Sequence, residues 1–238
     1  MVSLVPSVTE TVALSAPGLL VGATDYCVHP ADLDARRVGG SKFPDVDAVL
    51  ALEPDLVLAN VEENREQDVV ALRAAGIPVW TTAAADTVPA ALASLRRMLV
   101  DALGLGEPEW LRAAEAEWSR PLPPVRATAV TCVWRRPWVV LGRDTFAGDV
   151  LRRLGVANAY ATDAERYPRP TVDELRTTAA DLMVLPDEPY PFSRTDGPDA
   201  FPGRRCALVD GRHLTWWGPS LARAREVLAP ALRDTVGP

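Results

Sequence analysis

The chain has 238 residues, of which 48% are hydrophobic and 24% are charged, and its formal net charge is −7. The apolar content is too high for an intrinsically disordered protein, and the acidic balance disfavours nucleic-acid binding through a broad basic face. No apolar run approaches the roughly 20 residues that a helix needs to span a bilayer. The composition therefore indicates an ordinary globular protein that buries a sizeable core.

The N-terminus and the cysteines bear on the compartment. Met1 is followed directly by the apolar run 2–5, without the basic region, longer apolar region and cleavage site of a signal peptide. We therefore expect a cytoplasmic protein as the sequence stands, or a periplasmic, membrane-associated one if the N-terminus has been trimmed or misassigned. The three cysteines lie far apart and form no CxxC pair, which predicts buried or half-buried thiols instead of a disulfide framework or a structural zinc site.

The N-terminal half alternates short apolar runs with amphipathic segments. Ser7 and Glu10 have the spacing of a capping box, which predicts that a helix begins there. Continuously apolar strands that alternate with helices are typical of a parallel sheet covered on both faces. The pattern predicts strands over 2–5, 19–24, 55–60 and 78–82, and further helices over 46–52 and 64–75.

The middle of the chain carries helical patterns and no strand pattern. The longest helical pattern spans 87–103, and a second runs from Glu107 to about Arg120, where a group of prolines ends it. This stretch is the candidate connector between two domains. We predict an N-terminal α/β lobe over 1–105, a connecting helix over 106–121 and a C-terminal α/β lobe over 122–238.

The second half repeats the scheme of the first and contains an internal echo of it. Val46 is followed nine residues later by an Asp-Leu pair that opens an apolar strand, and Val172 is followed in the same way. Two similar α/β lobes joined by a helix are the simplest interpretation, with a ligand cleft lined by the loops at the carboxyl ends of their strands. The elements predicted here are strands over 127–133, 138–141, 181–185 and 207–210, and helices over 144–154, 171–179 and 219–233.

The loop after the second predicted strand carries three side chains with possible binding chemistry, Tyr26, Cys27 and His29. Cys27 and His29 suit a soft or borderline metal, although two ligands are too few for a tight site. The alternatives of His29 as a metal ligand, a contact in the cleft or a packing residue therefore stay open.

The loop after the third predicted strand is acidic. Glu62 and Glu63 either favour the N-terminus of the following helix, with Asn64 as its N-cap, or face the cleft. Glu66 is expected to face solvent, and a carboxylate exposed at the tip of a lobe is what a partner carrying Arg would bind.

Tryptophan is the compositional anomaly, because the chain has 7 Trp but only 4 Phe and 4 Tyr. Trp134 and Trp80 lie on or beside predicted strands, so we expect them to fill the cores of the lobes. Trp216 and Trp217 lie in a predicted loop, so we expect their broad apolar faces to line the cleft.

Arg135 and Arg136 follow Trp134 directly and suit carboxylate or phosphate groups of a ligand. Together with the indoles they favour a large, flat, partly anionic or amide-bearing ligand. The sequence has no GxSxG, HExxH, P-loop or GxGxxG motif, so we predict a binding protein and not an enzyme.

Several short motifs resemble class III periplasmic substrate-binding proteins of ABC importers, in particular the cobalamin-binding and helical-backbone metal receptor branch. They cover nearly the whole chain: VSLVPSVTE (2–10), TDYCVHP (24–30), GSKFPD (40–45), PDLVL (54–58), EEN (62–64), WRRPW (134–138), EPYPF (188–192), LVDG (208–211) and TWWG (215–218).

The resemblance implies an α/β fold of two Rossmann-like lobes with parallel sheets, joined by a single rigid helix, with the ligand in a shallow cleft between the lobes. Trp216 falls at a position where an aromatic residue flanks the corrin ring in the cobalamin branch. Glu66 falls where the family has a carboxylate that docks onto Arg of the permease.

We therefore predict a monomeric solute-binding protein that holds a corrinoid such as cobalamin, or another metal chelate such as haem or a ferric siderophore, for uptake through an ABC permease. No intrinsic cofactor and no catalytic residue is expected. A direct transition-metal-ion binding protein, and a cytoplasmic corrinoid-handling factor or enzyme on the same scaffold, are the alternatives. The predicted ligand contacts are Tyr26, His29, Glu62, Glu63, Trp134, Arg135, Tyr190, Trp216 and Trp217, with His29 as the candidate metal ligand and Glu66 as the partner-docking residue.

Overall fold

The structure of the protein is a computed structural model that describes residues 1–236. The chain forms two compact units whose segments alternate along the sequence. The first unit comprises Met1–Ala84, Leu92–Arg112 and Trp217–Pro219, and the second comprises Ala85–Ala91, Ala113–Trp216 and the described residues from Ser220 onward. Because α4 (Val88–Arg96) and α5 (Glu109–Trp118) each contribute residues to both units, the boundaries predicted at 105 and 121 stay a prediction.

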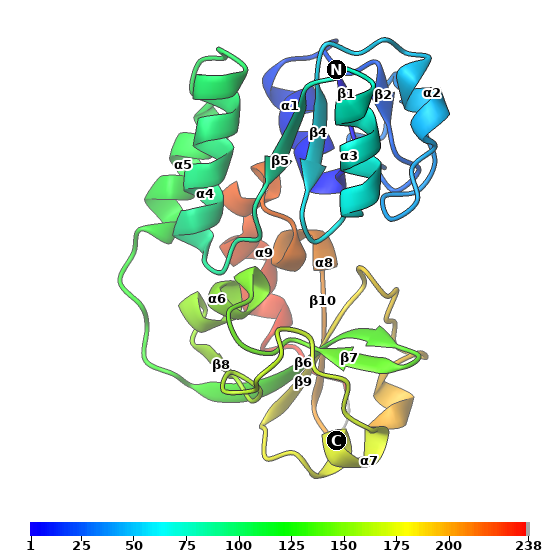
Figure 1. The fold of residues 1–238 in the computed structure, drawn as a ribbon. Coiled ribbons are helices and arrows are strands. Elements are labelled where there is room, and N and C mark those ends of the chain that lie inside the picture. Colours follow the sequence, from blue (N-terminus) through cyan, green and yellow to red (C-terminus); the bar gives the residue numbers. More distant parts are fainter. Residues whose placement is uncertain (237–238) are drawn as a thin grey trace. The chain divides into compact units, whose positions relative to one another are not determined.

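The first unit is built on a parallel sheet of five strands in the order β3-β2-β1-β4-β5 (Figure 1). The four predicted strands are present in shortened form. The unpredicted one, β3, has only two exposed arginines, so no apolar run marks it. The strands are β1 (Val2–Ser3), β2 (Gly22–Ala23), β3 (Arg36–Arg37), β4 (Val57–Asn60) and β5 (Val79–Thr82).

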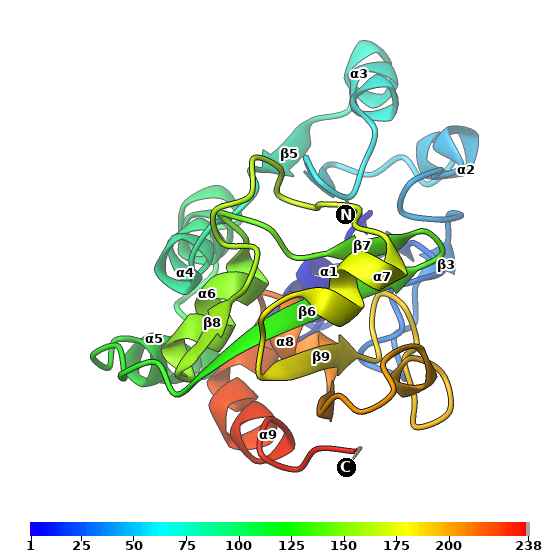
Figure 2. The same cartoon turned by 90° about the horizontal axis from the view of Figure 1, so that it is seen from below.

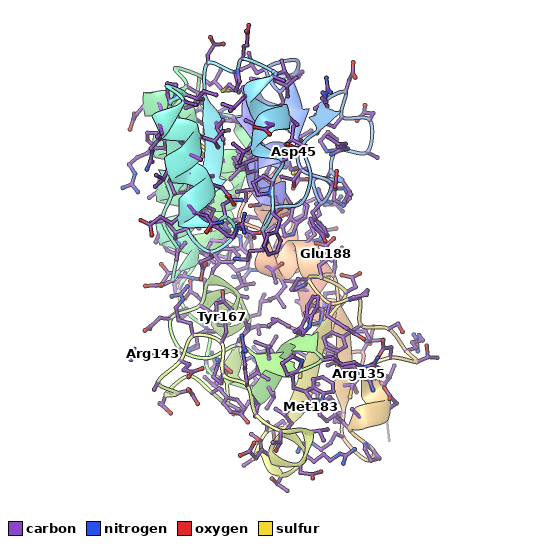
Figure 3. The ribbon with its side chains drawn as sticks, turned by 45° about the vertical axis from the view of Figure 1, so that its right-hand side comes forward. Asp45, Arg135, Arg143, Tyr167, Met183 and Glu188 are labelled. Atoms are coloured by element: carbon purple, nitrogen blue, oxygen red, sulfur yellow. The ribbon has the colours of Figure 1, made fainter. Side chains whose placement is uncertain are left out.

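Three helices accompany this sheet: α1 (Pro6–Ser15), α2 (Val46–Leu50) and α3 (Glu66–Ala74). Asp45, labelled in Figure 3, caps α2 by accepting a hydrogen bond from the amide of Ala48 at 2.9 Å. Strands and helices share one core of fully buried side chains. Its members are Val2, Leu4, Val38, Val49, Val57 and Leu72.

The capping box predicted at Ser7 and Glu10 is wrong. The helix α1 begins at Pro6, its N-cap is Val5, and no side chain caps it. Proline is suited to the first helical position because it has no N–H to satisfy and its φ is already helical. Ser7 therefore lies inside the first turn, and both it and Glu10 are buried.

The segment predicted as one long helix over 87–103 is two consecutive pieces. The helix α4 ends at Arg96 and continues as a π-helical segment, η1 (Arg97–Ala102). Within the first unit, the indole N–H of Trp110 on α5 donates to the hydroxyl of Ser15 at 3.1 Å. This bond ties the start of α5 to the end of α1.

The second unit has its own sheet, in which β6 (Ala127–Arg135) is the central strand. It pairs in parallel with β8 (Val156–Asn158) and β9 (Leu182–Pro186), and β9 pairs in parallel with β10 (Cys206–Val209); Figure 2 shows β6 and β9 side by side. The C-terminal end of β6 pairs with β7 (Trp138–Val140) in the antiparallel sense. A two-residue connection is too short for a parallel crossover, so this hairpin departs from an otherwise parallel sheet.

Helices and 3-10 turns surround this sheet. The helix α7 begins with a complete capping box, in which Thr171 and Glu174 bond each other's backbone amides. The predicted helix over 219–233 is a 3-10 turn followed by a shorter helix, and α8 was not predicted. The segments are α6 (Phe146–Arg153), α7 (Val172–Thr177), η2 (Pro198–Ala200), α8 (Gly211–Thr215), η3 (Pro219–Ala222) and α9 (Ala224–Ala231).

The core of the second unit is distinct from that of the first. It is formed by Val130, Cys132, Val140, Leu175, Met183, Leu185, Phe192, Ala200, Phe201 and Cys206. All three cysteines are free and buried, as predicted. Within residues 1–236, none of the helices has the length and apolar character needed to cross a membrane.

Candidate functional site

The β6–β7 hairpin and the loop after β9 bring a group of aromatic residues together in the second unit. The rings of Trp134 and Tyr190 meet edge to face, with centroids 5.6 Å apart and planes at 81°. Tyr190 contacts Phe192 at 4.6 Å, and Phe192 stacks on Trp138 at 6.0 Å. We call the Trp134–Tyr190 pair the aromatic edge; it is backed by side chains that pack into the core.

Trp134 does not fill the core, contrary to the expectation from its place beside a strand. It is 42% exposed, and its indole N–H donates to the carbonyl oxygen of Arg136 at 3.2 Å. The register of β6 shifts between Cys132 and Trp134, where the hairpin with β7 begins. An irregularity of this kind changes the face to which a side chain points, so strand periodicity alone does not place Trp134 correctly.

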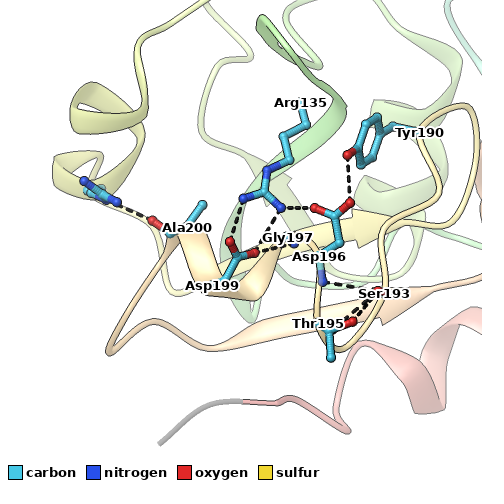
Figure 4. A network of polar contacts seen from close by, with 9 residues as sticks. Arg135, Tyr190, Ser193, Thr195, Asp196, Gly197, Asp199 and Ala200 are labelled. Atoms are coloured by element: carbon cyan, nitrogen blue, oxygen red, sulfur yellow. Dashed lines mark hydrogen bonds and ion pairs between the residues drawn. The ribbon is translucent and has the colours of Figure 1, made fainter.

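Arg135 follows Trp134 on β6, and its guanidinium is bonded by carboxylates of the same unit (Figure 4). Nη1 donates to Asp196 and, at 3.0 Å, to Asp199, while Nη2 donates to Asp199 at 2.6 Å. The hydroxyl of Tyr190 donates to the other oxygen of Asp196 at 2.8 Å. The guanidinium also lies 5.6 Å from the ring centre of Trp138. The side chain of Arg135 is only 14% exposed, and the predicted ligand-carboxylate role stays untested.

Glu188 begins the loop after β9 and is half-buried; Figure 3 labels it together with Arg135. Its carboxylate accepts a hydrogen bond from Trp216. Burial raises the pKa of Glu188, and the neighbouring carboxylates of Asp187 and Asp210 raise it further. The loop is pressed against Gly211, where a Cβ would lie 2.5 Å from the amide nitrogen of Glu188. Only glycine allows this close approach.

Trp216 and Trp217 are each only 9% exposed, so their indoles offer little surface in this structure. Trp216 belongs to the second unit and Trp217 to the first. Near Trp216, the His213 ring is 2.8 Å from the Asp210 carboxylate, which holds the pKa of that carboxyl below its usual value. The roles of Trp216 and Trp217 as ligand contacts stay predictions.

In the first unit, the loops after β2 and β3 carry large apolar side chains exposed to solvent. Tyr26 is 66% exposed, and its ring lies against Gly40, where a Cβ would be 3.4 Å away. Phe43 is 70% exposed, and the guanidinium of Arg65 lies 4.4 Å above its ring. Phe43 was missed as a candidate; its place in the GSKFPD motif, next to two residues that favour turns, was the available signal.

Asn64 does not cap α3 as predicted, since the N-cap is Arg65. Its buried amide instead ties three loops together: its oxygen accepts from the amide of Asn60 at 2.9 Å, and its nitrogen donates to the carbonyl oxygens of Leu4 and Ser41 at 3.2 and 2.9 Å. Asn64 therefore supports the loop that carries the acidic residues.

The acidic residues of that loop are accessible. Glu62 is half-buried, and its carbonyl oxygen accepts from Lys42. Glu63 is exposed, yet the surrounding protein displaces enough water to raise the pKa of its carboxyl, against the opposing effect of Lys42. Glu66 is exposed at the start of α3, beside a shallow hollow of about 600 Å³ that Arg65 and Val70 also line.

The predicted metal chemistry finds little support in the first unit. Cys27 is fully buried and bonded to the hydroxyls of Thr9 and Thr24, at 3.0 and 3.1 Å, and burial raises the pKa of its thiol. His29 is half-buried. Over residues 1–236, no group of three or more His, Cys, Asp or Glu side chains is arranged to hold a metal ion.

Comparison with solved structures shows a shared fold. The periplasmic vitamin B12-binding protein BtuF of Vibrio cholerae matches with a TM-score of 0.73 and 17% identity, over 98% of this chain and 95% of that one. The periplasmic haem-binding protein RhuT from Roseiflexus sp. RS-1 matches with a TM-score of 0.77 and 22% identity, over 98% of this chain and 97% of that one. A periplasmic haem-binding protein from Pseudomonas aeruginosa matches with a TM-score of 0.76 and 24% identity, over 99% of this chain and 94% of that one.

Sequence comparison assigns the family. No curated protein is significantly similar to this chain. The sequence profile described as "Periplasmic binding protein" does match, over residues 1–198. Two α/β units with largely parallel sheets, a profile match over most of the chain and full-length structural similarity agree with one another. The chain therefore belongs to the periplasmic binding protein family, a family of solute-binding proteins.

Proposed function

We propose that the protein binds a corrinoid or another metal chelate, with haem or a ferric siderophore next after a corrinoid, and that it acts by binding and not by catalysis. The observation that carries the proposal is the aromatic edge of the second unit. Trp134 is 42% exposed and is held edge to face against Tyr190, at the carboxyl ends of the strands where α/β sheets bind ligands.

The area of an indole face is sufficient for this role. Burying about 100 Å² of aromatic surface contributes roughly 2–3 kcal/mol at about 25 cal/mol per Å². Two such contacts and a few hydrogen bonds support micromolar affinity after the costs of association. The ligands named for proteins of the same fold, vitamin B12 and haem, are planar chelates of this size and support the ligand class.

The other predicted residues receive roles within the same proposal. In the first unit, Tyr26 and His29 supply hydrogen bonds or an axial contact, and Glu62 and Glu63 accept hydrogen bonds from amide or cationic groups. We assign Glu66 to docking on an ABC permease, because its carboxylate is exposed at the N-terminal end of α3. The proposal takes the protein to work as a monomer outside the cytoplasm.

A titration tests the ligand class. Cyanocobalamin, dicyanocobinamide and haemin are added in turn, and visible absorption and tryptophan fluorescence are followed. We expect saturable quenching with at least one ligand, and at least about tenfold weaker binding in Trp134→Ala, which corresponds to about 1.4 kcal/mol.

Tyr167→Ala is the matched control, because Tyr167 is similarly exposed, at 40%, in another loop of the second unit. It should bind as the wild type does. Absence of quenching with all three ligands, or equal losses in the two variants, would refute the proposal.

A further inference from the structure

The guanidinium of Arg135 in the second unit is already paired with carboxylates of the protein itself. Arg135 is 14% exposed, and Asp196 and Asp199 occupy its guanidinium from two directions (Figure 4). One positive and two negative charges leave this cluster with a net charge of −1. A guanidinium bonded by two carboxylates has little free energy to gain from a third, so Arg135 is a poor site for a ligand carboxylate.

The same contacts fix the loop that carries Tyr190. Asp199 accepts from the amide of Gly197 at 2.7 Å in addition to its bonds to Arg135. Gly197 has a φ of 129°, and a Cβ there would lie 2.7 Å from the ring of Phe192, so this turn requires glycine. Asp196 accepts from Arg135 on one oxygen and from the Tyr190 hydroxyl on the other. Arg135 on β6 thus anchors the loop 187–199 through two carboxylates.

The hydrogen bond from Tyr190 to Asp196 sets the direction of the phenol ring. The two rings meet edge to face, with their planes at 81°, while Trp134 stays 42% exposed. An edge-to-face pair of this kind is attractive beyond the area that it buries, which favours one ring orientation.

The loop that carries Tyr190 also carries the carboxylates of Asp187 and Glu188, and Asp210 after β10 interacts electrostatically with Glu188. Such acceptors suit primary amides, which line the periphery of a corrinoid, and repel carboxylates, which haem carries. Arg136, the exposed cation of the hairpin, is the alternative partner for a carboxylate.

We propose that Arg135 is a positioning residue which holds Tyr190 edge to face against Trp134 through Asp196, and that its pairing with Asp199 makes this surface selective for amide-bearing corrinoids over carboxylate-bearing haem. The inference rests on the proposed function, because it names the ligand class of the same surface.

Two variants separate positioning from charge. Arg135→Lys keeps the charge but loses the forked geometry, so it should weaken dicyanocobinamide and haemin alike, by about fivefold. In a Tyr190→Phe background the same change should have almost no further effect, because the bond through which Arg135 acts is already absent.

Asp199→Asn frees part of the guanidinium and leaves the bond between Asp196 and Tyr190 intact. It should tighten haemin binding about fivefold, the gain of one partly exposed ion pair, while cobinamide binding changes little. Arg223→Lys is the control, because Arg223 forms an ion pair with Glu226 at the start of α9, and its replacement should affect the binding of neither ligand.

A ligand-free measurement keeps the inference testable in every case. Arg135→Lys and Tyr190→Phe should reduce the same near-ultraviolet circular dichroism signal of the aromatic edge. An unchanged signal in Arg135→Lys, or a selective loss of haemin binding in that variant, would overturn the positioning role while the proposed function stands. If the wild type binds none of the ligands, the proposed function and the selectivity fail together, and the dichroism still decides the positioning.

Discussion

Glu188 and Asp199 lie in the same loop region of the second unit, yet their surroundings shift their pKa values in opposite directions. Burial and two neighbouring carboxylates raise the pKa of Glu188. Hydrogen bonds from Arg135 and from the amide of Gly197 hold the pKa of Asp199 well below its usual range. Folding therefore favours the protonated form of Glu188 and the ionised form of Asp199.

These shifts predict opposite pH dependences of stability. A raised folded-state pKa means that Glu188 contributes most below its unfolded value of 4.5, and that this contribution is lost as the pH rises through the folded-state pKa. We therefore expect Glu188→Gln to equal the wild type in acid and to become the more stable protein as the pH rises above about 5. Urea unfolding at pH 4, 6 and 8 measures the difference.

Asp199→Asn is the control of opposite sign. Its lowered folded-state pKa means that Asp199 stabilises the fold above its unfolded value of 3.8, and that this stabilisation is lost as the pH falls through the folded-state pKa. The variant should be less stable than the wild type at pH 7 and approach it in acid. The same sign of pH dependence in both variants would contradict this account of the two carboxyls.

At the scale of single elements, a capping-box spacing predicts the start of a helix correctly only when its side chains bond the free backbone amides of the first turn. The capping box at Thr171 and Glu174 does so for α7. The identical spacing at Ser7 and Glu10 does not do so in α1, because Pro6 begins that helix one residue earlier. A spacing rule describes which bonds are available, and the neighbouring residue decides whether they form.

The two helix starts give a matched pair of variants. Thr171→Ala removes the hydroxyl that accepts from the amide of Glu174, at 3.3 Å, so it should cost about 1 kcal/mol of unfolding free energy. Ser7→Ala should cost much less, since no side chain caps α1. Chemical denaturation measures both changes, and equal effects would show that the capping geometry of α7 contributes nothing.

Short elements are the ones that the sequence failed to predict. The strand β3 is two exposed arginines, and β8 is only Val156–Asn158. The helix α8 has five residues and depends on the Asp210 side chain, which accepts from the amide of His213 at 2.9 Å. Elements this short have too few residues for a period to be visible, and partners elsewhere in the chain hold them in place.

At the scale of the whole molecule, the described residues include two separate hydrophobic clusters, one in each unit. Val57 is fully buried in the core of the first unit and Val130 in that of the second, and the two clusters have no residue in common. The internal echo in the sequence corresponds to this organisation: Val46 begins α2 before β4, and Val172 begins α7 before β9.

Separate cores predict additive effects of mutation. Val57→Ala and Val130→Ala each remove two buried carbon groups, so each should cost about 2 kcal/mol. The double variant should show the sum within about 0.5 kcal/mol, as expected for sites with no shared partners. Equilibrium unfolding of the four proteins measures this. A double variant that departs from the sum by more than 1.5 kcal/mol, as a marked coupling would produce, would contradict the separation of the cores.

The sequence by itself determined the alternation of strands and helices, and with it the α/β class, the largely parallel pairing of the strands and the buried thiols. These properties depend on apolar runs and helix termini, which are local in the chain. The tertiary structure alone decided that Trp134 is exposed, that Arg65 covers Phe43, and that Arg135 is bonded by Asp196 and Asp199, which are 61 and 64 positions away. The charge of a side chain is visible in the sequence, but whether that charge remains free for a ligand depends on which distant carboxylates the fold places beside it.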